Sequence, residues 1–301
     1  NGAVILCNLS ASNEIIGKYK YREMLAKSQS GRCIAGYVYT SAGVGESSTD
    51  LVFGGHGIIA EYGSVLGQTQ RFRKDSQLLT ADIDVCKLIR ERVNATSFTQ
   101  TDLPRKSREV QLLEAPPQPD ELNRNVDPHP FVPSDPATRD ERCQEVFSIQ
   151  AAGLEKRYLH TKLQKAVLGI SGGLDSALAL LVTVKAFDSL GIPRKNIIAV
   201  TMPGFGTTNQ SYHIAIELMQ SMGVEIREIN ITQACLQHFK DIGHDPAIHD
   251  VTYENVQARE RTQILMDIAN KEGGLVIGTG DLSELALGWC TYNGDHMSFY
   301  S

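Results

Sequence analysis

The 301-residue chain has no excess of basic residues, because 29 lysines and arginines stand against 35 aspartates and glutamates. A protein that binds nucleic acid over a broad surface usually carries a basic face, so a net charge of -6 argues against that class. The apolar runs are shorter than the roughly 20 residues of a membrane-spanning helix, and no signal-peptide pattern opens the chain. We therefore expect no nucleic-acid partner and no membrane partner, and any nucleotide must be held by a local site.

The six cysteines lack a pairing pattern. None forms a Cys-x-x-Cys pair, so their spacing gives neither a zinc signature nor a disulfide framework. Free thiols are typical of a reducing compartment, and we expect a cytoplasmic protein. Cys7 lies inside an apolar run, where we expect a buried structural thiol.

Prolines are concentrated in one stretch. Eight of the eleven lie between Pro104 and Pro136, in a segment without an apolar period. This pattern predicts a linker over residues 103–138, which separates a first domain (1–102) from a second domain (139–301).

The first domain is expected to be rich in strands. The apolar runs predict strands over residues 3–9, 34–40, 57–61, 64–69 and 78–83, and helices over 19–29 and 84–94. Tyr62 and Gly63, between two of these strands, favour a hairpin turn.

The second domain alternates between helices and strands. The pattern predicts helices over 140–160, 176–190, 210–222, 233–242 and 253–271, the last capped by Thr252, and strands over 166–169, 197–202, 225–229 and 275–278. Such alternation is typical of a parallel sheet covered on both faces. Ligands of such sheets bind beyond the carboxyl ends of the strands. The loops that follow Gly169, Met202 and Gly278 should therefore converge.

A glycine-rich turn joins the first of these strands to its helix. It reads Gly169-Ile170-Ser171-Gly172-Gly173-Leu174-Asp175-Ser176. Bare backbone N–H groups at a helix N-terminus favour a bound anion. The turn lacks the lysine of a P-loop and the glycine spacing of a dinucleotide fingerprint. An ordinary turn in which the Asp and Ser cap the helix is the simpler alternative.

A second polar motif, Gly278-Thr279-Gly280-Asp281-Leu282-Ser283-Glu284, follows the last strand. A threonine hydroxyl and a carboxylate at a strand end suit a nucleotide with its magnesium. A polar helix cap would equally explain Asp281 and Ser283.

The hexapeptide Ser-Gly-Gly-Leu-Asp-Ser at 171–176 is similar to the pyrophosphatase loop of ATP-cleaving, adenylate-forming amidotransferases. Together with the motif at 278–284 and the stretch 250–257, it resembles the synthetase domain of the glutamine-dependent NAD+ synthetase family, from roughly residue 140 to 300. Residues 8–12 (Asn-Leu-Ser-Ala-Ser), 45–50 and 53–56 resemble the nitrilase-type glutaminase domain of the same family. The resemblance implies an α/β fold. We expect the C-terminal half of an αββα nitrilase-like sandwich, followed by a doubly wound parallel-sheet domain of the adenine nucleotide α-hydrolase type.

The resemblance also implies roles for single residues. ATP would be bound by residues 169–176 and Thr279, and magnesium by Asp175 and Glu284. Deamido-NAD+ would be bound by Asn255, Glu284, Trp289, Cys290, Thr291 and Tyr292. Ser12 and Lys18 would line a glutamine pocket.

Two of these assignments leave alternatives open. Asn255 shares a helix face with Arg259 and Thr262, for which a solvated face is the simpler explanation. Trp289 is either a core aromatic or a wall against a base.

The implied reaction is the ATP-dependent amidation of deamido-NAD+ through an adenylate, with ammonia supplied by glutamine hydrolysis in a homo-oligomeric ligase. The family's Cys, Glu and Lys amidase residues precede the Asn-Leu-Ser-Ala-Ser motif. We therefore expect an internal segment of such an enzyme and assign no catalytic glutaminase residue. An inactive nucleotide-binding fragment, or another amidotransferase with the same loop, remains the alternative.

Overall fold

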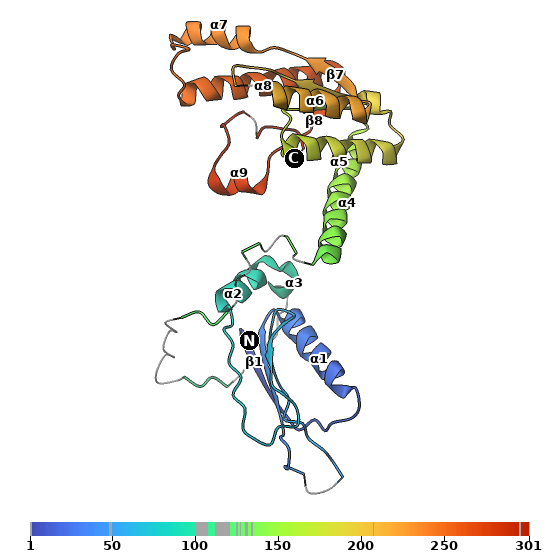
Figure 1. Ribbon diagram of the computed structural model, residues 1–301, viewed down its shortest axis with the longest axis vertical. Helices are drawn as coiled ribbons and strands as arrows, with labels where there is room; N and C mark the ends of the chain where they lie inside the picture. The colour runs from blue at the N-terminus through green and yellow to red at the C-terminus, as the bar shows by residue number, and fades with distance from the viewer. Residues whose placement is uncertain are drawn as a thin grey trace. The chain divides into compact units, whose positions relative to one another are not determined.

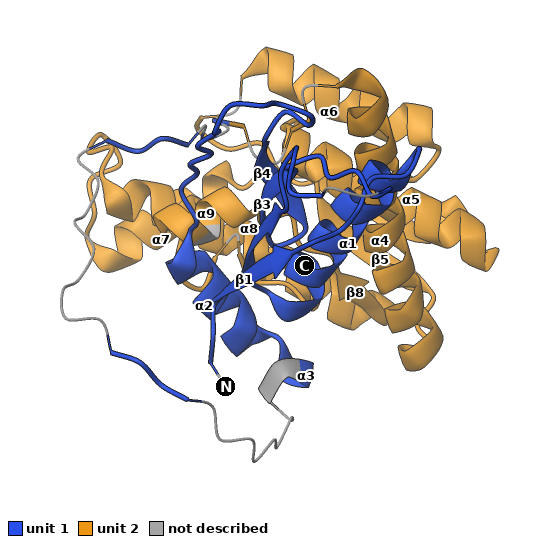
Figure 2. Ribbon diagram, turned by 90° about the horizontal axis from the view of Figure 1, so that it is seen from below, with its two compact units in different colours: residues 1–128 blue, residues 129–301 orange. Residues whose placement is uncertain are grey.

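The computed structural model describes residues 2–47, 50–99, 108–111, 121–124, 126, 128–129, 132–133, 135–206, 208–294 and 296–300. The chain divides into two compact units, Asn1–Pro128 and His129–Ser301 (Figure 2). Much of the stretch expected as a linker lies outside the described residues. None of the described helices is both long enough and apolar enough to cross a bilayer.

The first unit is built on a four-stranded sheet in the order β1-β2-β3-β4. Its elements are β1 (Ile5–Ser10), α1 (Lys18–Cys33), β2 (Gly36–Ser41), β3 (Gly57–Glu61), β4 (Ser64–Gln68), α2 (Val85–Asn94) and α3 (Thr96–Thr99). β1 pairs with β2 in parallel, and the other pairs are antiparallel. Tyr62 and Gly63 both have positive φ, 46° and 86°, which confirms the hairpin turn.

Helix α1 covers one face of this sheet. Ala26 of α1 packs with Tyr39 and Ile58, which lie on neighbouring strands. Because side chains alternate across a strand, Gly36 presents the other face. There a β-carbon on Gly36 would lie 2.9 Å from the side chain of Ile83.

The predicted strand over 78–83 is therefore wrong. The segment has no strand pairing in the described structure and crosses the sheet as an irregular strap. Leu79 packs over Gly67, where a β-carbon would lie 2.9 Å from the Leu79 side chain. Leu78 is 92% exposed. The apolar run reflects side chains that pack onto a face of the sheet, and it does not reflect backbone pairing at an edge.

The expectation of a buried Cys7 is also wrong, because Cys7 is exposed. β1 is an edge strand whose exposure alternates along its length. Ile5, Cys7 and Leu9 share the face turned away from α1, and Leu9 is 83% exposed. An apolar run on an edge strand therefore does not by itself bury its thiol.

The second unit contains a parallel sheet in the order β7-β6-β5-β8. Its elements are α4 (Pro136–Thr161), β5 (Lys165–Gly169), α5 (Leu174–Leu190), the 3-10 helix η1 (Arg194–Asn196), β6 (Ile197–Thr201), α6 (Asn209–Met222), β7 (Glu225–Glu228), α7 (Thr232–Ile242), α8 (Val251–Glu272), β8 (Gly274–Val276) and α9 (Leu282–Leu287) (Figure 1).

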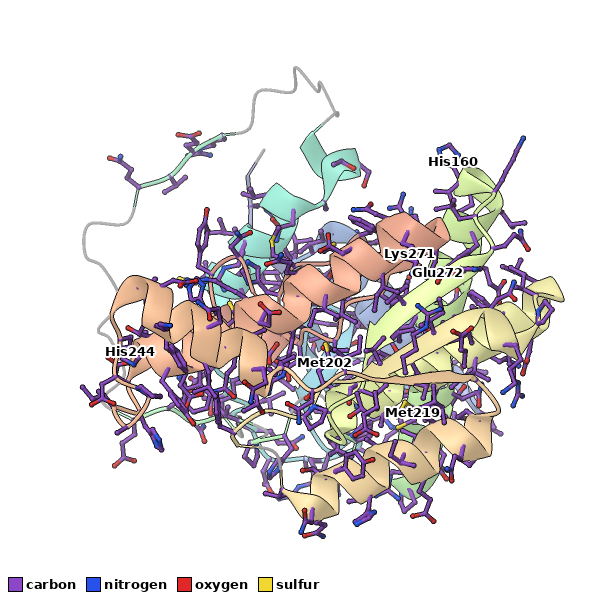
Figure 3. All side chains as sticks on the ribbon, turned by 90° about the horizontal axis from the view of Figure 1, so that it is seen from above. His160, Met202, Met219, His244, Lys271 and Glu272 are labelled. Atoms are coloured by element: carbon purple, nitrogen blue, oxygen red, sulfur yellow. The ribbon has the colours of Figure 1, made fainter. Side chains whose placement is uncertain are left out.

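Both faces of this sheet are covered, as the sequence predicts. Ala166 and Leu168 pack with α4, α5 and α6, whereas Val167 packs with α7 and α8. Met219 and Met202, labelled in Figure 3, belong to these two separate cores. The α/β fold class expected for this half is confirmed.

Several element boundaries differ from prediction because caps decide them. α4 begins at Pro136, inside the range expected as linker, because Asp135 accepts the N–H of Thr138 at 2.8 Å. The cap of α8 is Asp250, whose Oδ1 accepts the N–H groups of Thr252 and Tyr253, so the cap predicted at Thr252 is wrong.

Candidate functional site

A pocket of about 540 Å³ lies at the carboxyl ends of the parallel strands. Its lining includes Gly169, Ile170, Ser171, Asp175 and Ser176 from the glycine-rich turn. Met202 follows β6, and Thr279 and Glu284 follow β8, in the same lining. The three loops that the sequence predicts to converge therefore do so.

The glycine-rich turn is closed by its own serines. The Ser171 N–H donates to Ser176 Oγ at 3.3 Å, and the Gly173 N–H donates to Ser171 Oγ at 3.2 Å. Ser176 Oγ donates in turn to the Gly173 carbonyl at 3.0 Å. These bonds fix the turn around the entry to α5.

The N-terminus of α5 carries no side-chain cap among the described residues. Gly173 is its N-cap residue, and Asp175 lies in the first turn without bonding back to the cap. The alternative in which Asp and Ser cap the helix is therefore wrong. The first N–H groups of α5 remain available, with the positive end of the helix dipole, for an anion in the pocket.

Gly172 allows a close approach between the glycine-rich turn and α6. Its φ is +87°, and a β-carbon there would lie 2.3 Å from the main-chain oxygen of Ser211 in α6. Only glycine combines this backbone angle with this contact. Ser211 itself lines the pocket.

Glu284 both caps α9 together with Asp281 and lines the pocket. Asp281 Oδ1 accepts the N–H of Glu284 at 2.7 Å, and the Asp281 N–H donates to Glu284 Oε2 at 3.2 Å, which forms a capping box for α9. The cap proposed as an alternative for Asp281 is thus confirmed. Glu284 nevertheless lines the pocket that Asp175 also lines, and a carboxylate can accept more than one bond.

The described residues contain no group of three or more His, Cys, Asp or Glu side chains arranged to hold a metal ion. Two carboxylates alone suit Mg²⁺, which keeps waters and takes further oxygens from phosphate. The donor set of Asp175 and Glu284 fits a magnesium ion that enters with a nucleotide, and does not form a closed protein cage.

Several pocket residues on α8 were not predicted, among them Tyr253, Gln257 and Arg261. Gln257 is buried, and its Oε1 accepts the N–H of Phe205 at 3.3 Å. Arg261 Nε donates to the Met202 carbonyl at 3.3 Å. Tyr253, Gln257 and Arg261 are spaced four residues apart and share the helix face that holds the loop after β6. That spacing is visible in the sequence and shows that the three share a face, but it does not show that this face lines a pocket.

The predicted residues after α9 lie outside the pocket lining. Thr291 Oγ1 donates to Asn255 Oδ1 at 2.9 Å, and Arg259 Nε donates to the Tyr292 carbonyl at 3.2 Å. The segment that contains Thr291 and Tyr292 is thereby fastened to α8. Thr262 lines the pocket, so a solvated face does not describe it, whereas Arg259 is exposed as that alternative requires.

Trp289 is not a core aromatic. Its side chain is 77% exposed, and that of Tyr292 is 82% exposed. Trp289 directly follows Gly288, the C-cap of α9, where the chain leaves the helix. Cys290 beside it is half-buried. Gly172, Gly173 and Leu174 also lie outside the pocket lining, with Leu174 87% exposed.

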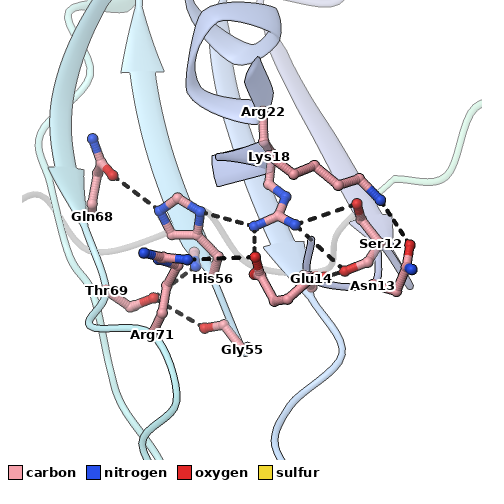
Figure 4. Close-up of polar contacts among 12 residues, drawn as sticks. Ser12, Asn13, Glu14, Lys18, Arg22, Gly55, His56, Gln68, Thr69 and Arg71 are labelled. Carbon is pink, nitrogen blue, oxygen red and sulfur yellow. Dashed lines mark hydrogen bonds and ion pairs between the residues drawn. The ribbon is translucent and has the colours of Figure 1, made fainter. Parts of the chain in front are cut away.

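Ser12 and Lys18 belong to the first unit. Ser12 lies in the loop between β1 and α1, and Lys18 is the first residue of α1 (Figure 4). Lys18 Nζ donates to Asn13 Oδ1 at 2.7 Å. Ser12 accepts longer contacts from Arg22, at 3.4 Å to Oγ and 3.5 Å to the carbonyl. The structure thus brings both residues into one polar cluster.

His56 in this cluster is neutral by its bonding. Arg22 Nη1 lies 3.2 Å from His56 Nδ1, and a guanidinium only donates, so Nδ1 accepts and the proton is on Nε2. Nε2 then donates to Gln68 Oε1 at 2.9 Å. Burial lowers the pKa of His56, and the positive charge of Arg22 adds to that effect, against the opposing bond to Gln68.

Comparison with known proteins gives the same picture over the whole chain. Residues 147–298 match the family model described as NAD synthase. The glutamine-dependent NAD(+) synthetase of Mycobacterium tuberculosis is 43% identical over 100% of the chain and 46% of the relative. That of Aquifex aeolicus is 29% identical over 98% of the chain and 49% of the relative. The chain spans about half the length of the curated relatives it matches.

A solved structure supports the fold. The glutamine-dependent NAD+ synthetase from Acinetobacter baumannii, in complex with ADP, matches with a TM-score of 0.50 and 22% identity. The match covers 99% of this chain and 47% of that chain. The likeness in fold thus extends beyond the residues matched by the family model.

Proposed function

Because the chain belongs to the NAD synthase family, we propose that its second unit binds ATP and uses it to convert deamido-NAD+ to NAD+. In the intact protein, ammonia would come from glutamine hydrolysis. The observation that carries this proposal is the single pocket lined by both the lysine-free glycine turn and the Thr279–Glu284 loop. The 43% identical relatives named as glutamine-dependent NAD(+) synthetases support the choice of substrates.

The glycine turn would hold the phosphates of ATP. The N-terminus of α5 lies at the pocket and has no side-chain cap among the described residues. Its first backbone N–H groups and the helix dipole would favour a negatively charged phosphate there. Ser171 and Ser176 add hydroxyls, and Thr279 donates from the opposite loop. No lysine is needed if backbone groups supply the positive potential.

Asp175 and Glu284 would hold magnesium with the phosphates. When bound, the ion would neutralise charge that develops on the leaving pyrophosphate. The two side chains line one pocket from the first turns of α5 and α9, so they could share a cation that also contacts the nucleotide.

The chemistry would proceed in two displacements. A carboxylate oxygen of deamido-NAD+ attacks the α-phosphorus of ATP, which forms an acyl–adenylate and releases pyrophosphate. The nitrogen of ammonia then attacks the acyl carbon, AMP leaves, and one proton is lost to solvent. Neither step requires a nucleophilic side chain, so the residues of the pocket would act by holding and orienting the reactants.

Deamido-NAD+ would contact Asn255, Glu284 and the segment from Trp289 to Tyr292 with Cys290 and Thr291. The bonds from Asn255 and Arg259 to this segment support its placement near the site. Ser12 and Lys18 would line the glutamine pocket of the first unit. We retain the proposals of a homo-oligomer and of a cytoplasmic location.

The test is NAD+ formation from deamido-NAD+, Mg·ATP and ammonium by the intact protein that contains this chain. Production of NAD+ with equimolar AMP supports the proposal. Binding of Mg·ATP without turnover would favour a non-catalytic nucleotide-binding role. Turnover of a different acid substrate in place of deamido-NAD+ would favour another amidotransferase of the same group.

A further inference from the structure

Arg22 is a buried arginine of helix α1. It lies in the second turn of α1, and its side chain is only 6% exposed. A buried charge is tolerated when it is paired and hydrogen-bonded. Its partner Glu14, at 2.8 Å from Nη1 to Oε1, is 7% exposed.

The guanidinium links α1 to two other segments of the first unit, the loop before α1 and the segment just before β3 (Figure 4). Nη1 contacts Glu14 in the loop before α1 and His56 just before β3. Nη2 contacts both the hydroxyl and the carbonyl of Ser12. One side chain on α1 therefore fixes the loop that carries Ser12 against the sheet.

The far side of the cluster is equally constrained. His56 is held by Gln68 of β4, and Arg71 lies 3.4 Å from the second oxygen of Glu14. A β-carbon on Gly54 would lie 2.5 Å from Glu14 Oε1, so the carboxylate is packed against backbone. Glu14 and His56 cannot shift without disturbing Arg22.

We propose that Arg22 is a positioning residue that sets the affinity for glutamine by fixing Ser12, which rests on the proposed function of the first unit. Arg22 reaches Ser12 through its Nη2 while its Nη1 is anchored to Glu14 and His56. The side chain is enclosed, so it acts through Ser12 without touching the substrate. Loss of Arg22 frees the loop that carries Ser12. A displaced Ser12 weakens the binding of glutamine, and the reaction of ammonia at the second unit is unaffected.

The test compares Arg22→Met with Arg32→Met in the intact protein that contains this chain. Arg32 lies on the same helix but is exposed, so its variant controls for loss of charge from α1. We expect Arg22→Met to raise the KM for glutamine by about tenfold or more, with the ammonia-dependent rate unchanged. Arg32→Met should leave both values within about twofold of wild type.

Two milder variants guard against misfolding. Glu14→Gln keeps the shape of the cluster but removes the anchoring charge, and Arg22→Lys keeps a charge without the planar fork. Both should raise the glutamine KM by less than Arg22→Met does. A purely structural role would lower the glutamine-dependent kcat in proportion to the folded fraction and leave KM unchanged, and that result would overturn the inference.

The proposed function can fail separately. A wild-type protein that uses ammonia but not glutamine would overturn the glutamine site itself, and the inference with it. A wild-type protein that uses both, with a glutamine KM that Arg22→Met leaves unaltered, would overturn only the role given to Arg22.

Discussion

Gly172 and Ser211 meet beside the pocket, which Ser211 lines and Gly172 does not, and a β-carbon on the glycine would lie 2.3 Å from the main-chain oxygen of the serine. The contact joins the glycine turn to the first turn of α6. Ser211 is itself fixed, because its N–H donates to Thr208 Oγ1 at 3.2 Å. The turn is therefore shaped by its neighbour as well as by its own sequence.

The first prediction concerns this contact. Gly172→Ala must either push α6 away or change the turn, and it also places a side chain at a φ of +87°. We expect Mg·ATP affinity to fall by about tenfold or more, because the N–H groups would no longer converge. Calorimetric titration with Mg·ATP measures the change.

Gly223→Ala is the matched control for backbone strain alone. Its φ is +71°, and no described atom lies within 4 Å of a β-carbon there. It should cost about 1 kcal/mol of stability and leave ATP affinity intact. Equal losses of affinity in the two variants would contradict the importance of the Ser211 contact.

A second prediction concerns the metal carboxylate. Asp175→Asn keeps the size of the side chain but removes a charge from the pocket. Mg²⁺-dependent turnover should fall, with a loss of transition-state stabilisation on the order of 3 kcal/mol. Asp188→Asn, at the other end of α5 and paired with the exposed Arg194, is the control. Wild-type rates in Asp175→Asn, measured as ammonia-dependent NAD+ formation, would refute the magnesium role.

The third prediction concerns the loop after β6. Gln257→Met removes the acceptor of the Phe205 N–H and should destabilise the second unit by about 1–3 kcal/mol, with a raised KM for ATP. Gln263→Met changes an exposed residue of the same helix and should have little effect. Urea unfolding and ATP saturation curves report the two quantities; an unchanged KM in Gln257→Met would show that this bond does not shape the pocket.

A fourth prediction follows from the protonation of His56. Its pKa is lowered from the ordinary value of 6.5, chiefly by burial. Just below pH 6.5, His56 therefore stays neutral in the folded state but is protonated in the unfolded state. The stability gained from neutral His56 is present above pH 6.5 and is lost as the pH falls through that value. Urea unfolding at about pH 7.5 and 5.5 should show a larger loss in wild type than in His56→Gln. Identical pH dependence in the two proteins would contradict this assignment.

The sequence predicts the sheet of the second unit well because buried parallel strands are marked by continuous apolar runs and by glycines at helix ends. It also predicts that Asp175, Thr279 and Glu284 meet, because strand order brings carboxyl ends to one edge. It fails for the segment 78–83, whose apolar residues pack onto the sheet without strand pairing, and for Cys7, which stays exposed on an edge strand. Such outcomes depend on which face is covered, and periodicity carries no information about that.

The sequence also misses Gln257 and Arg261. Their importance comes from main-chain partners in a loop some 52 and 59 residues away. Nothing local to α8 marks one polar face as holding that loop and the other as holding the segment near Thr291. Only the folded structure separates the two.

The most direct test of the central claim is isotope exchange between pyrophosphate and ATP, measured in the intact protein with and without deamido-NAD+ and with ammonia left out. The pocket assignment predicts exchange that requires both Mg²⁺ and deamido-NAD+ and that disappears in Asp175→Asn. Exchange that proceeds without deamido-NAD+, or that survives unchanged in Asp175→Asn, would contradict the claim that this pocket activates the substrate carboxylate.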